Sequence, residues 1–330
     1  MLLVVLQIIV IFFLVVYLYN RLTCGVMESI TCLAGKTAIV TGGNSGIGLQ
    51  VVKILASRGC RIIIADKVDS EKSKREVINE TGNPNILTKH LDLSSFESIR
   101  EFAADIKITE PKLDILVNNA GVGAFYDQTT KDGINALMQI NYFGPFLLTH
   151  LLTDLLKKSS PSRIVFTSSC LAFTTNLSES LENFKNPETS KWSIIPNSLI
   201  YTYGNSKLAT LIASDEIGNR LKGTGVTSNS CHPGACRTNI FVTSLKGYNF
   251  FFYFTEFWNF ITSKTVWNAA QTTVHLATSK NVENITSNYF WDCKPFYKPF
   301  LAKNPAFCAK LFETTENIVG LKESEKIVKS

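Results

Sequence analysis

The sequence has 330 residues, of which 45% are hydrophobic and 18% charged, so the chain can bury a substantial core and is not intrinsically disordered. The formal net charge of +6 is modest for this length, and the basic residues are scattered, which argues against a nucleic-acid partner. The eight cysteines form no CxxC pair and no cluster with histidine at metal-ligand spacing. The sequence therefore predicts no metal site and favours free thiols in a reducing compartment.

The chain starts with an apolar segment at residues 2–19 that contains a single glutamine. As a helix it would be about 27 Å long, close to the hydrocarbon thickness of an endoplasmic reticulum bilayer. No basic residue precedes it and no small-x-small site follows it, so an uncleaved anchor is favoured over a signal peptide. Arg21 on its C-terminal flank predicts a cytosolic domain. Sequons at Asn79, Asn176 and Asn284 would be used only if the domain were lumenal.

A glycine-rich turn follows the first predicted strand. Residues 36–40 are β-branched and small apolar residues typical of a buried strand, and apolar residues recur at helical spacing from Ile47 onward. Between them lies Thr-Gly-Gly-Asn-Ser-Gly-Ile-Gly, residues 41–48. A helix N-terminus offers unpaired N–H groups, and glycines let a pyrophosphate approach the backbone, so this turn predicts nucleotide binding. The residues expected to contact the nucleotide are Gly42, Asn44, Ser45, Gly46, Ile47 and Gly48.

The second predicted strand, residues 61–66, ends in an acid 18 residues beyond Gly48. A carboxylate at this place can accept hydrogen bonds from both adenosine ribose hydroxyls and would repel a 2′-phosphate, so Asp66 favours NAD(H) over NADP(H). Lys67 follows at once and could instead neutralise such a phosphate. Both residues are therefore candidate cofactor contacts, with opposite consequences for cofactor preference.

The third and fourth predicted strands supply further contacts. Residues 85–92 run into a helix cap, where Asp92 and Leu93 are placed to meet the adenine; the alternative is that Ser94 or Ser95 merely caps the next helix. Residues 113–118 are apolar except for Asp114 and Asn118, as expected for a strand covered on both faces. This strand ends in Asn-Asn-Ala-Gly, and the residues expected at the cofactor are Asn119, Ala120 and Gly121.

The second half of the chain carries the polar groups with reactive chemistry. A long helix is predicted from about residue 130 to 158, with Asn141 inside its apolar stripe, where a buried amide needs partners. The fifth predicted strand, from Arg163, delivers Ser168 and Ser169 at its C-terminal end. Open α/β sheets bind their ligands at that edge.

Tyr203 and Lys207 occupy positions i and i+4 of a predicted helix and therefore share one face. A sixth strand over residues 226–231 is followed by His232-Pro-Gly and Thr238. Strands alternate with helices throughout, so the fold class is α/β, a doubly wound parallel sheet of the Rossmann-like kind in a single domain. The N-terminal membrane anchor helix would precede it.

Five motifs occur in a fixed order: TGGNSGIG at 41–48, NNAG at 118–121, the serines at 168–169, YGNSK at 203–207 and HPG at 232–234. Together they resemble the short-chain dehydrogenase/reductase family over residues 36–300. The N-terminal anchor, the Gly144-Pro-Phe-Leu-Leu-Thr segment and the ending Tyr289-Phe-Trp-Asp-Cys-Lys look most like the membrane-bound retinol dehydrogenase group. A related branch acting on polyprenol-type lipids is also similar.

The resemblance implies that Tyr203 is the general acid/base and Lys207 its pKa-lowering neighbour and ribose ligand. It implies that Ser169 orients the carbonyl, with Ser168 as the alternative, and that Asn141 completes a proton relay. The chemistry of these groups agrees with this. A free tyrosine with a pKa of about 10 is a poor base, and a nearby ammonium together with the positive nicotinamide ring favours its phenolate.

At the nicotinamide end, the resemblance implies that Thr238 holds the carboxamide and that Pro233 and Gly234 shape the wall, with His232 structural. The sequence departs from the family in two places. Ser169 and Tyr203 are 34 residues apart, which indicates a loop inserted beside the substrate site. Asp66-Lys67 also stands where much of the retinol dehydrogenase group is expected to have an arginine. These departures bear on substrate identity and cofactor preference.

The most aromatic stretch, residues 241–267, is interpreted as a lid over a long apolar substrate, with a core helix or a membrane-interface surface as alternatives. We expect residues 1–20 to be the anchor, 21–34 a linker and 35–330 the catalytic domain, with 172–200 as a substrate-side loop. The expected activity is hydride transfer between NAD(P) and a lipophilic alcohol or carbonyl, such as retinol/retinal or another isoprenoid. The alternatives are a hydroxysteroid dehydrogenase and a non-catalytic nucleotide-binding membrane scaffold. The expected partners are a small lipophilic substrate and membrane lipid, with a homodimer left open.

Overall fold

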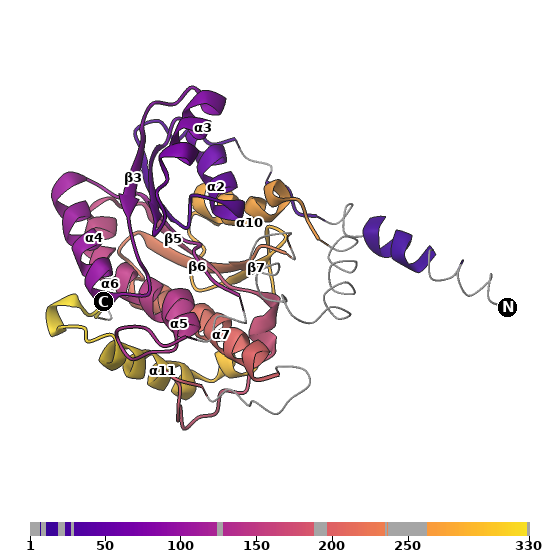
Figure 1. Ribbon diagram of the computed structural model, residues 1–330, viewed down its shortest axis with the longest axis vertical. Coiled ribbons are helices and arrows are strands. Elements are labelled where there is room, and N and C mark those ends of the chain that lie inside the picture. Colours follow the sequence, from indigo (N-terminus) through magenta and orange to yellow (C-terminus); the bar gives the residue numbers. More distant parts are fainter. Residues whose placement is uncertain are drawn as a thin grey trace.

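The computed structural model describes residues 7, 11–18, 24–27, 30–123, 128–187, 197–234, 236 and 263–328, and of residues 197–199 the backbone alone. Within these ranges eight strands form one sheet in the order β3-β2-β1-β4-β5-β6-β7-β8 (Figure 1). All neighbouring strands pair in parallel except β7 and β8. The strands are β1 Thr37–Thr41, β2 Arg61–Asp66, β3 Ile86–His90, β4 Ile115–Asn118, β5 Ser162–Thr167, β6 Val226–His232, β7 Tyr289–Trp291 and β8 Lys294–Pro295.

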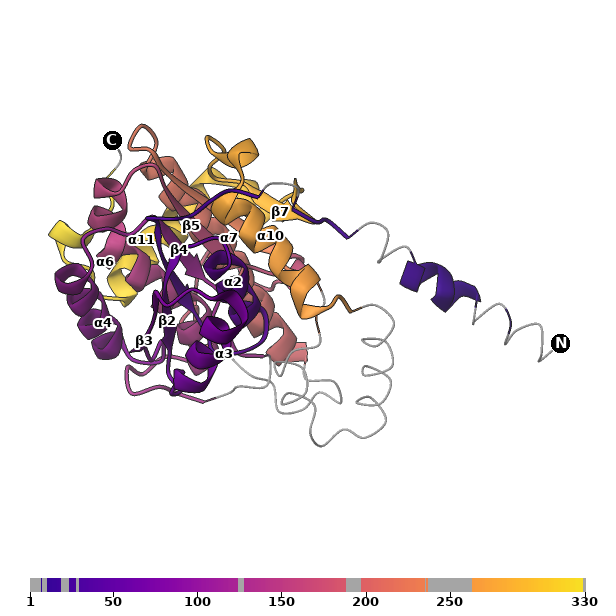
Figure 2. The same cartoon turned by 90° about the horizontal axis from the view of Figure 1, so that it is seen from above.

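Helices cover both faces of the sheet, as the two views show (Figures 1 and 2). One face carries α2 Gly46–Ala56, α3 Glu71–Thr81 and α10 Val266–Thr278; the other carries α4 Phe96–Thr109, α6 Gly144–Lys158, α7 Asn197–Arg220 and α11 Pro305–Ile318. Alternate strand residues serve the two cores. Ile39 packs with the α4, α6, α7 and α11 side chains, whereas Ala38 and Val40 pack with those of α2 and α10. The predicted doubly wound α/β domain is therefore confirmed.

The ligand-binding edge follows from the strand order. The chain runs outward from β1 through β2 to β3 and then crosses back, so that β4 lies on the other side of β1. A reversal of this kind opens a crevice at the carboxyl ends of the strands, because the connections leave on opposite sides. The glycine turn after β1 and the Asn-Asn-Ala-Gly segment after β4 both lie at this place.

The long helix begins later than its apolar pattern predicts. Residues 130–135 form a turn closed by a bridge between Thr129 and Asn135, because Gly133 has a φ of +72° and Asn135 caps the helix that follows. The helix then runs through α5 Ala136–Met138 and a π-helical turn, η1 Gln139–Phe143, before α6. Such turns are rare and often lie at functional sites.

Several elements escaped the sequence analysis. The hairpin of β7 and β8 extends the sheet by two strands, and helices α10 and α11 close the two layers. The remaining short elements are the 3₁₀ turns η2 Cys170–Phe173, η3 Lys280–Val282, η4 Leu301–Lys303 and η5 Glu323–Glu325. The helix that carries Tyr203 already begins at Asn197.

Residues 11–18 are helical and lie apart from the domain in both views, with exposed apolar side chains such as Phe12 (Figures 1 and 2). Among the residues that the structure describes, no helix is both long enough and apolar enough to cross a membrane. Most of the remaining predicted anchor, and residues 241–262 of the predicted lid, lie outside the described ranges. The chain that follows the predicted anchor contacts the domain, since the Gly25 N–H donates to Asp292 Oδ1 at 3.2 Å.

Candidate functional site

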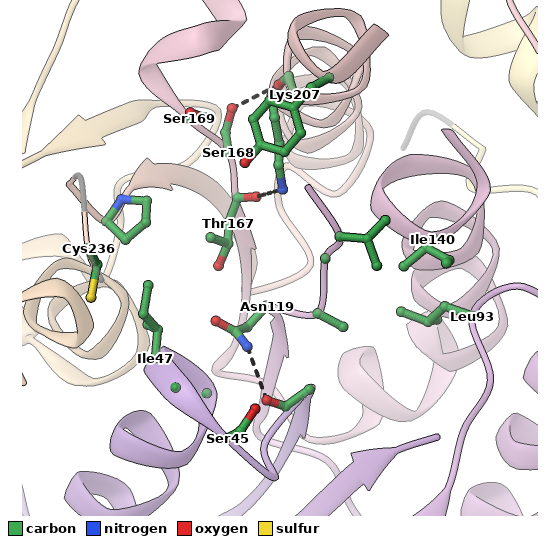
Figure 3. Close-up of a pocket in the computed structure, with 18 of the residues that line it drawn as sticks. Ser45, Ile47, Leu93, Asn119, Ile140, Thr167, Ser168, Ser169, Lys207 and Cys236 are labelled. Carbon is green, nitrogen blue, oxygen red and sulfur yellow. Dashed lines mark hydrogen bonds between the residues drawn. The ribbon is translucent and has the colours of Figure 1, made fainter. Parts of the chain in front are cut away.

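A cavity of about 550 Å³ opens at the carboxyl edge of the sheet. Figure 3 shows Ser45 and Ile47 at the α2 end of this cavity, with Leu93 and Ile140 on another wall. The cavity brings together almost all of the predicted site residues. Those lining it are Gly42, Ser45, Gly46, Ile47, Gly48, Asp66, Lys67, Asp92, Leu93, Asn119, Ala120, Gly121, Ser168, Ser169, Tyr203, Lys207, Pro233 and Gly234.

Two predicted residues do not line the cavity, and a third is not among the described residues. Asn44, within the glycine turn, is bonded to β2 and α3: its N–H donates to Asp66 Oδ2 at 3.3 Å and its carbonyl accepts from the Ser73 hydroxyl at 2.8 Å. Asn141 does not line the cavity either, although it contacts residues that do. Thr238 lies outside the described residues.

The glycine turn leaves no room for side chains where it meets β4. A Cβ at Gly48 would lie 2.2 Å from the Gly42 carbonyl oxygen and 2.5 Å from Asn119 Nδ2. Gly42 has a φ of +65°, and a Cβ there would lie 2.9 Å from Ala120 Cα. Glycine is therefore required at both positions. At Gly48 the reason is the close approach of neighbouring atoms, and at Gly42 it is both close approach and the positive φ.

Thr41 joins the two strand ends that flank the crevice. Its hydroxyl accepts from the N–H groups of Asn119 and Ala120, both at 3.0 Å. In return, Asn119 Nδ2 donates to the Thr41 carbonyl at 3.0 Å. Sequence reasoning did not single out Thr41, because its partners are 78 residues away and no local spacing predicts the contact.

The acidic end of the cavity contains an ion pair. Lys67 Nζ lies 2.9 Å from Asp92 Oδ2, so the cation that could meet a phosphate already has an anionic partner. Burial acts to raise the pKa of Asp92, but hydrogen bonds from Ser94 and Lys67 outweigh it and hold that pKa below its ordinary value. Asp66 accepts from the N–H groups of Asn44 and Val68. Two carboxylates and one ammonium thus give this end a net negative charge.

The two serines at the end of β5 have different surroundings. The Ser168 hydroxyl donates to the Lys207 carbonyl at 2.8 Å and is buried, so its proton is used within the fold (Figure 3). The Ser169 hydroxyl accepts from the Leu171 N–H at 3.1 Å and hydrogen-bonds the Tyr203 side chain. Of the two, Ser169 is the one joined to the tyrosine hydroxyl at the cavity.

Tyr203 lines the cavity from α7. Burial raises the pKa of its phenol above the ordinary value of about 10, and the hydrogen bond with Ser169 opposes part of the rise. The sequence-based expectation was a pKa lowered by Lys207 together with the positive ring of the cofactor. In the chain by itself, the phenol keeps its proton at neutral pH.

The Lys207 ammonium is buried between α7 and β5. Its Nζ donates to the Thr167 carbonyl at 3.0 Å and lies 5.6 Å from the centroid of the Tyr203 ring (Figure 3). Burial lowers the pKa of Lys207 to about 8, because the charged form is desolvated. Tyr203 and Lys207 therefore lie on the same face of α7, as their spacing predicts.

Asn141 lies in the π-helical turn and fixes the loop after β4. Its Oδ1 accepts from the Val122 N–H at 2.8 Å, and its Nδ2 donates to the Val122 carbonyl at 3.1 Å. Its main-chain carbonyl accepts from the Thr210 hydroxyl at 3.1 Å. Gly121 passes between this amide and the lysine, since a Cβ there would lie 3.2 Å from Asn141 Oδ1 and 3.5 Å from Lys207 Nζ.

The wall after β6 is formed around a neutral histidine. Burial lowers the pKa of His232 to about 3, and its Nδ1 accepts from the Cys170 N–H at 3.2 Å. Gly234, two residues after His232, has a φ of +92° and is covered by the aliphatic part of the Lys264 side chain. Lys264 in turn pairs with Asp292 in the β7–β8 turn.

Thr167 is a second residue that sequence reasoning missed. Its hydroxyl is buried, lines the cavity region between Asn119 and Lys207, and has no hydrogen-bond partner among the described residues (Figure 3). It is the last residue of β5, so the rule that ligands bind at the carboxyl edge of an open sheet could have identified it.

The site suits a dinucleotide. No side chain caps the N-terminus of α2 and no acidic residue lies in its first turn, which leaves that end for a phosphate. The glycines provide the close approach, Asp66 can accept from a ribose, and the orphaned Thr167 hydroxyl lies where a polar ligand group could meet it.

Comparison with known proteins gives a consistent result. The family model of the short chain dehydrogenases matches residues 36–181. The chain is 34% identical to retinol dehydrogenase 12 of Bos taurus, over 90% of each protein. It is 36% identical to retinol dehydrogenase 13 of Homo sapiens, over 93% of this chain and 91% of that one. A crystal structure of a protein from Mycobacterium paratuberculosis shares the fold, with a TM-score of 0.67, 23% identity and coverage of 90% and 98%.

Gly42→Ala should weaken dinucleotide binding at least about tenfold, because the new Cβ would push the turn away from Ala120. Gly82→Ala is the matched control, since Gly82 has a φ of +68° at the end of α3 and nothing within 4 Å of its Cβ position. Both changes should cost about 1 kcal/mol of stability for the positive φ. Titration calorimetry with NAD(H) and urea denaturation measure the two quantities, and equal dissociation constants for both variants would contradict the assigned role of Gly42.

Proposed function

The chain belongs to the short-chain dehydrogenase/reductase family and is an oxidoreductase, and from this premise we propose that its substrate is a lipophilic alcohol or the corresponding carbonyl compound. Retinol and retinal, or a related isoprenoid, are the proposed pair. The observation that carries the proposal is the hydrogen-bonded Tyr203–Ser169 pair beside Lys207, at a cavity lined by the glycine turn. These are the groups that hydride transfer to or from a carbonyl needs next to a dinucleotide.

Tyr203 is proposed as the general acid and base. In the chain alone its phenol is protonated, which is the form that donates a proton to a carbonyl being reduced. When bound, the dinucleotide supplies the hydride donor or acceptor and, in its oxidised form, a positive charge. For alcohol oxidation the phenol must lose its proton, and cationic charge near it favours that step.

Ser169 is proposed to orient the substrate oxygen, and Lys207 to bind the ribose and favour the phenolate. Ser169 suits its role better than Ser168, whose proton is donated to a main-chain carbonyl. The pKa of Lys207 is about 8, which is close to physiological pH, so its ammonium can pass a proton on. Asn141 is proposed to complete the relay, since its amide adjoins the Ser206 hydroxyl at 3.4 Å, one residue before the lysine.

We propose that the family's NAD(P) cofactor is NAD(H) in this protein, with NADP(H) as the weaker alternative. The support is electrostatic. Lys67 is paired with Asp92, and Asp66 adds a second carboxylate at the same end of the cavity. A 2′-phosphate would bring two further negative charges close to this net negative site, whereas ribose hydroxyls can donate to Asp66.

The lipophilic substrate is supported by two observations. The chain is about 35% identical to several proteins named retinol dehydrogenase, over most of its length. The cavity is also lined by apolar side chains, including Val122, Ile140 and Leu171. Residues 172–200 and 241–267 are proposed as the loop and lid that complete the substrate site. A hydroxysteroid is the second candidate substrate, because the same apolar side chains would also suit a steroid.

We propose that residues 1–20 anchor the enzyme in the endoplasmic reticulum membrane and that residues 35–330 form the catalytic domain in the cytosol. The support is the apolar composition of residues 2–19, the helix over residues 11–18 and its exposed apolar side chains. A substrate dissolved in the bilayer could then reach the site without crossing water. The non-catalytic scaffold is disfavoured, because a scaffold does not need the Tyr203–Ser169 hydrogen bond or a buried ammonium.

Ser169→Ala should lower kcat for retinol oxidation in detergent by about 10²- to 10³-fold, the loss expected when one oriented hydrogen-bond donor is removed. Ser168→Ala is the matched control and should stay within about tenfold of the wild type, because its hydroxyl serves the α7 backbone. Steady-state kinetics normalised to folded protein give both values. The reverse order of losses would assign the catalytic role to Ser168.

Asp66→Ser should raise the ratio of kcat/KM with NADP to that with NAD at least about tenfold, since the repelling carboxylate and ribose acceptor are lost. Asp69→Ser removes the same charge three residues later, at a side chain that accepts from the Glu71 N–H and does not line the cavity, and should change the ratio less than about twofold. A ratio that stays the same in both variants would remove Asp66 from its role in cofactor preference.

A further inference from the structure

Four exposed aromatic side chains gather beside the β7–β8 hairpin and form what we call the aromatic surface. They are Phe173, Phe296, Tyr297 and Phe300, with exposed fractions of 45%, 42%, 78% and 86%. The ring centroids of Phe173 and Phe296 are 6.5 Å apart, and those of Phe296 and Tyr297 are 5.8 Å apart. Phe300 follows three residues later, at the start of η4. Ring contacts thus link Phe173, Phe296 and Tyr297, and an exposed aromatic group of this kind marks an interaction site.

The aromatic surface is held in place by the fold. The Phe296 ring packs on Trp291 with the ring centroids 4.9 Å apart, and the Phe296 main-chain N–H donates to the Tyr289 carbonyl at 2.7 Å. Lys298 Nζ reaches across to α7, where it lies 2.7 Å from both Asp215 Oδ2 and the Ser287 carbonyl. The segment that carries Phe296 and Tyr297 is thus held by hydrogen bonds at Phe296 and at Lys298, with the aromatic rings exposed.

The chain around this surface is basic. Residues 293–312 contain four lysines and no acidic residue, although Asp292 and Glu313 flank this stretch and Lys298 is paired with Asp215. Two of these lysines, Lys294 and Lys303, are exposed and flank residues 296–300 in the sequence. Aromatic rings with a rim of lysines suit the headgroup region of a bilayer that contains anionic lipid.

The N-terminal chain holds this part of the domain close to the proposed membrane anchor. The Gly25 N–H donates to Asp292 in the β7–β8 turn, and the Met27 N–H donates to Gln271 of α10 at 3.3 Å. The apolar segment ends at Tyr19, and the chain between Tyr19 and Gly25 can span at most about 21 Å when fully extended. The hairpin that carries the aromatic surface therefore cannot lie far from the bilayer.

We propose that the aromatic surface is a membrane-docking surface that lies in the headgroup region of the bilayer in which the anchor is inserted. The proposal rests on the proposed anchor and lipid substrate. Phe173 ends the same 3₁₀ turn whose Leu171 lines the cavity, so the docked surface adjoins the substrate end of the site. Docking here would turn that end toward the lipid that contains the substrate.

The test compares two introduced tryptophans in the full-length protein, reconstituted in vesicles of phosphatidylcholine and phosphatidylserine. Phe300→Trp places the probe on the aromatic surface, and Ile108→Trp places it at an equally exposed position, 84% against 86%, near the end of α4. In both views α4 lies on the side of the domain away from the helix at 11–18 (Figures 1 and 2). Tyr297→Trp provides a second probe of the surface should Phe300→Trp fold poorly.

The emission that each probe adds to the parent protein is measured in vesicles with and without brominated acyl chains, which quench tryptophan at short range. We expect brominated lipid to remove at least half of the emission added at position 300 and none of that added at position 108. Equal quenching at both positions, or no quenching at positions 300 and 297, would overturn the proposal. In a third outcome, brominated lipid quenches neither probe, and the emission at position 300 instead shifts to the blue as the protein concentration rises in detergent. That outcome would assign the aromatic surface to a contact with a second copy of the chain and would also overturn the proposal.

Two further readouts separate this proposal from the proposed function. Flotation of the parent protein with the vesicles reports the anchor, and failure to float overturns the anchor and the docking surface together. Oxidation of retinol in detergent reports the activity independently of docking. Quenching at position 300 without activity supports the surface and contradicts the proposed substrate, whereas activity without quenching contradicts the surface alone.

Discussion

The junction of helix α7 with the end of strand β5 is the contact on which the rest of the site depends. Two hydrogen bonds make it, and both involve Lys207: its ammonium donates to the Thr167 carbonyl, and its carbonyl accepts from the Ser168 hydroxyl. Desolvating an ammonium is costly, so this arrangement must be compensated by well-placed acceptors. Because the junction fixes α7 against β5, it also fixes Tyr203 beside Ser169 at the mouth of the crevice.

The crevice itself depends on a second set of close contacts, at the switch between β1 and β4. Thr41 joins the two strand ends, and the absence of side chains at Gly42 and Gly48 lets the backbones approach each other. The two sets of contacts lie on neighbouring strands, so one cavity has a phosphate-sized cradle at one end and a hydroxyl pair at the other. The protonation of Tyr203 then follows from its surroundings, since burial retains the proton until cationic charge is brought close.

The sequence predicted the parts of this architecture that depend on local pattern. The strand runs and the glycine turn identified β1 through β6 and the nucleotide end, and the spacing of Tyr203 and Lys207 predicted their shared face. It did not predict the hairpin of β7 and β8, because strands of three and two residues are too short to show alternation. It also placed the start of the long helix too early, since an apolar residue at 134 continues the pattern through a turn that Gly133 imposes.

Contacts between residues far apart in the chain could not be predicted from local sequence pattern. Nothing near Thr41 indicates that its hydroxyl meets the end of β4, and nothing near Asp92 indicates that Lys67 pairs with it. From the sequence, the preference for Ser169 over Ser168 depends on the family resemblance alone, whereas the partners of the two hydroxyls give the proposal a physical argument. Roles that depend on a tertiary partner could be named from the sequence, but their physical basis required the fold.

The central claim is that one phenol moves the proton during the reaction, and Tyr203→Phe tests it most directly because the ring remains and only the hydroxyl is lost. The account predicts that kcat for retinol oxidation falls by about 10²- to 10⁴-fold while the dissociation constant for NAD(H) is unchanged. Tyr201→Phe, in the same helix and away from the cavity lining, should keep wild-type turnover. A Tyr203→Phe enzyme that oxidises a panel of lipid alcohols as fast as the wild type would contradict the account.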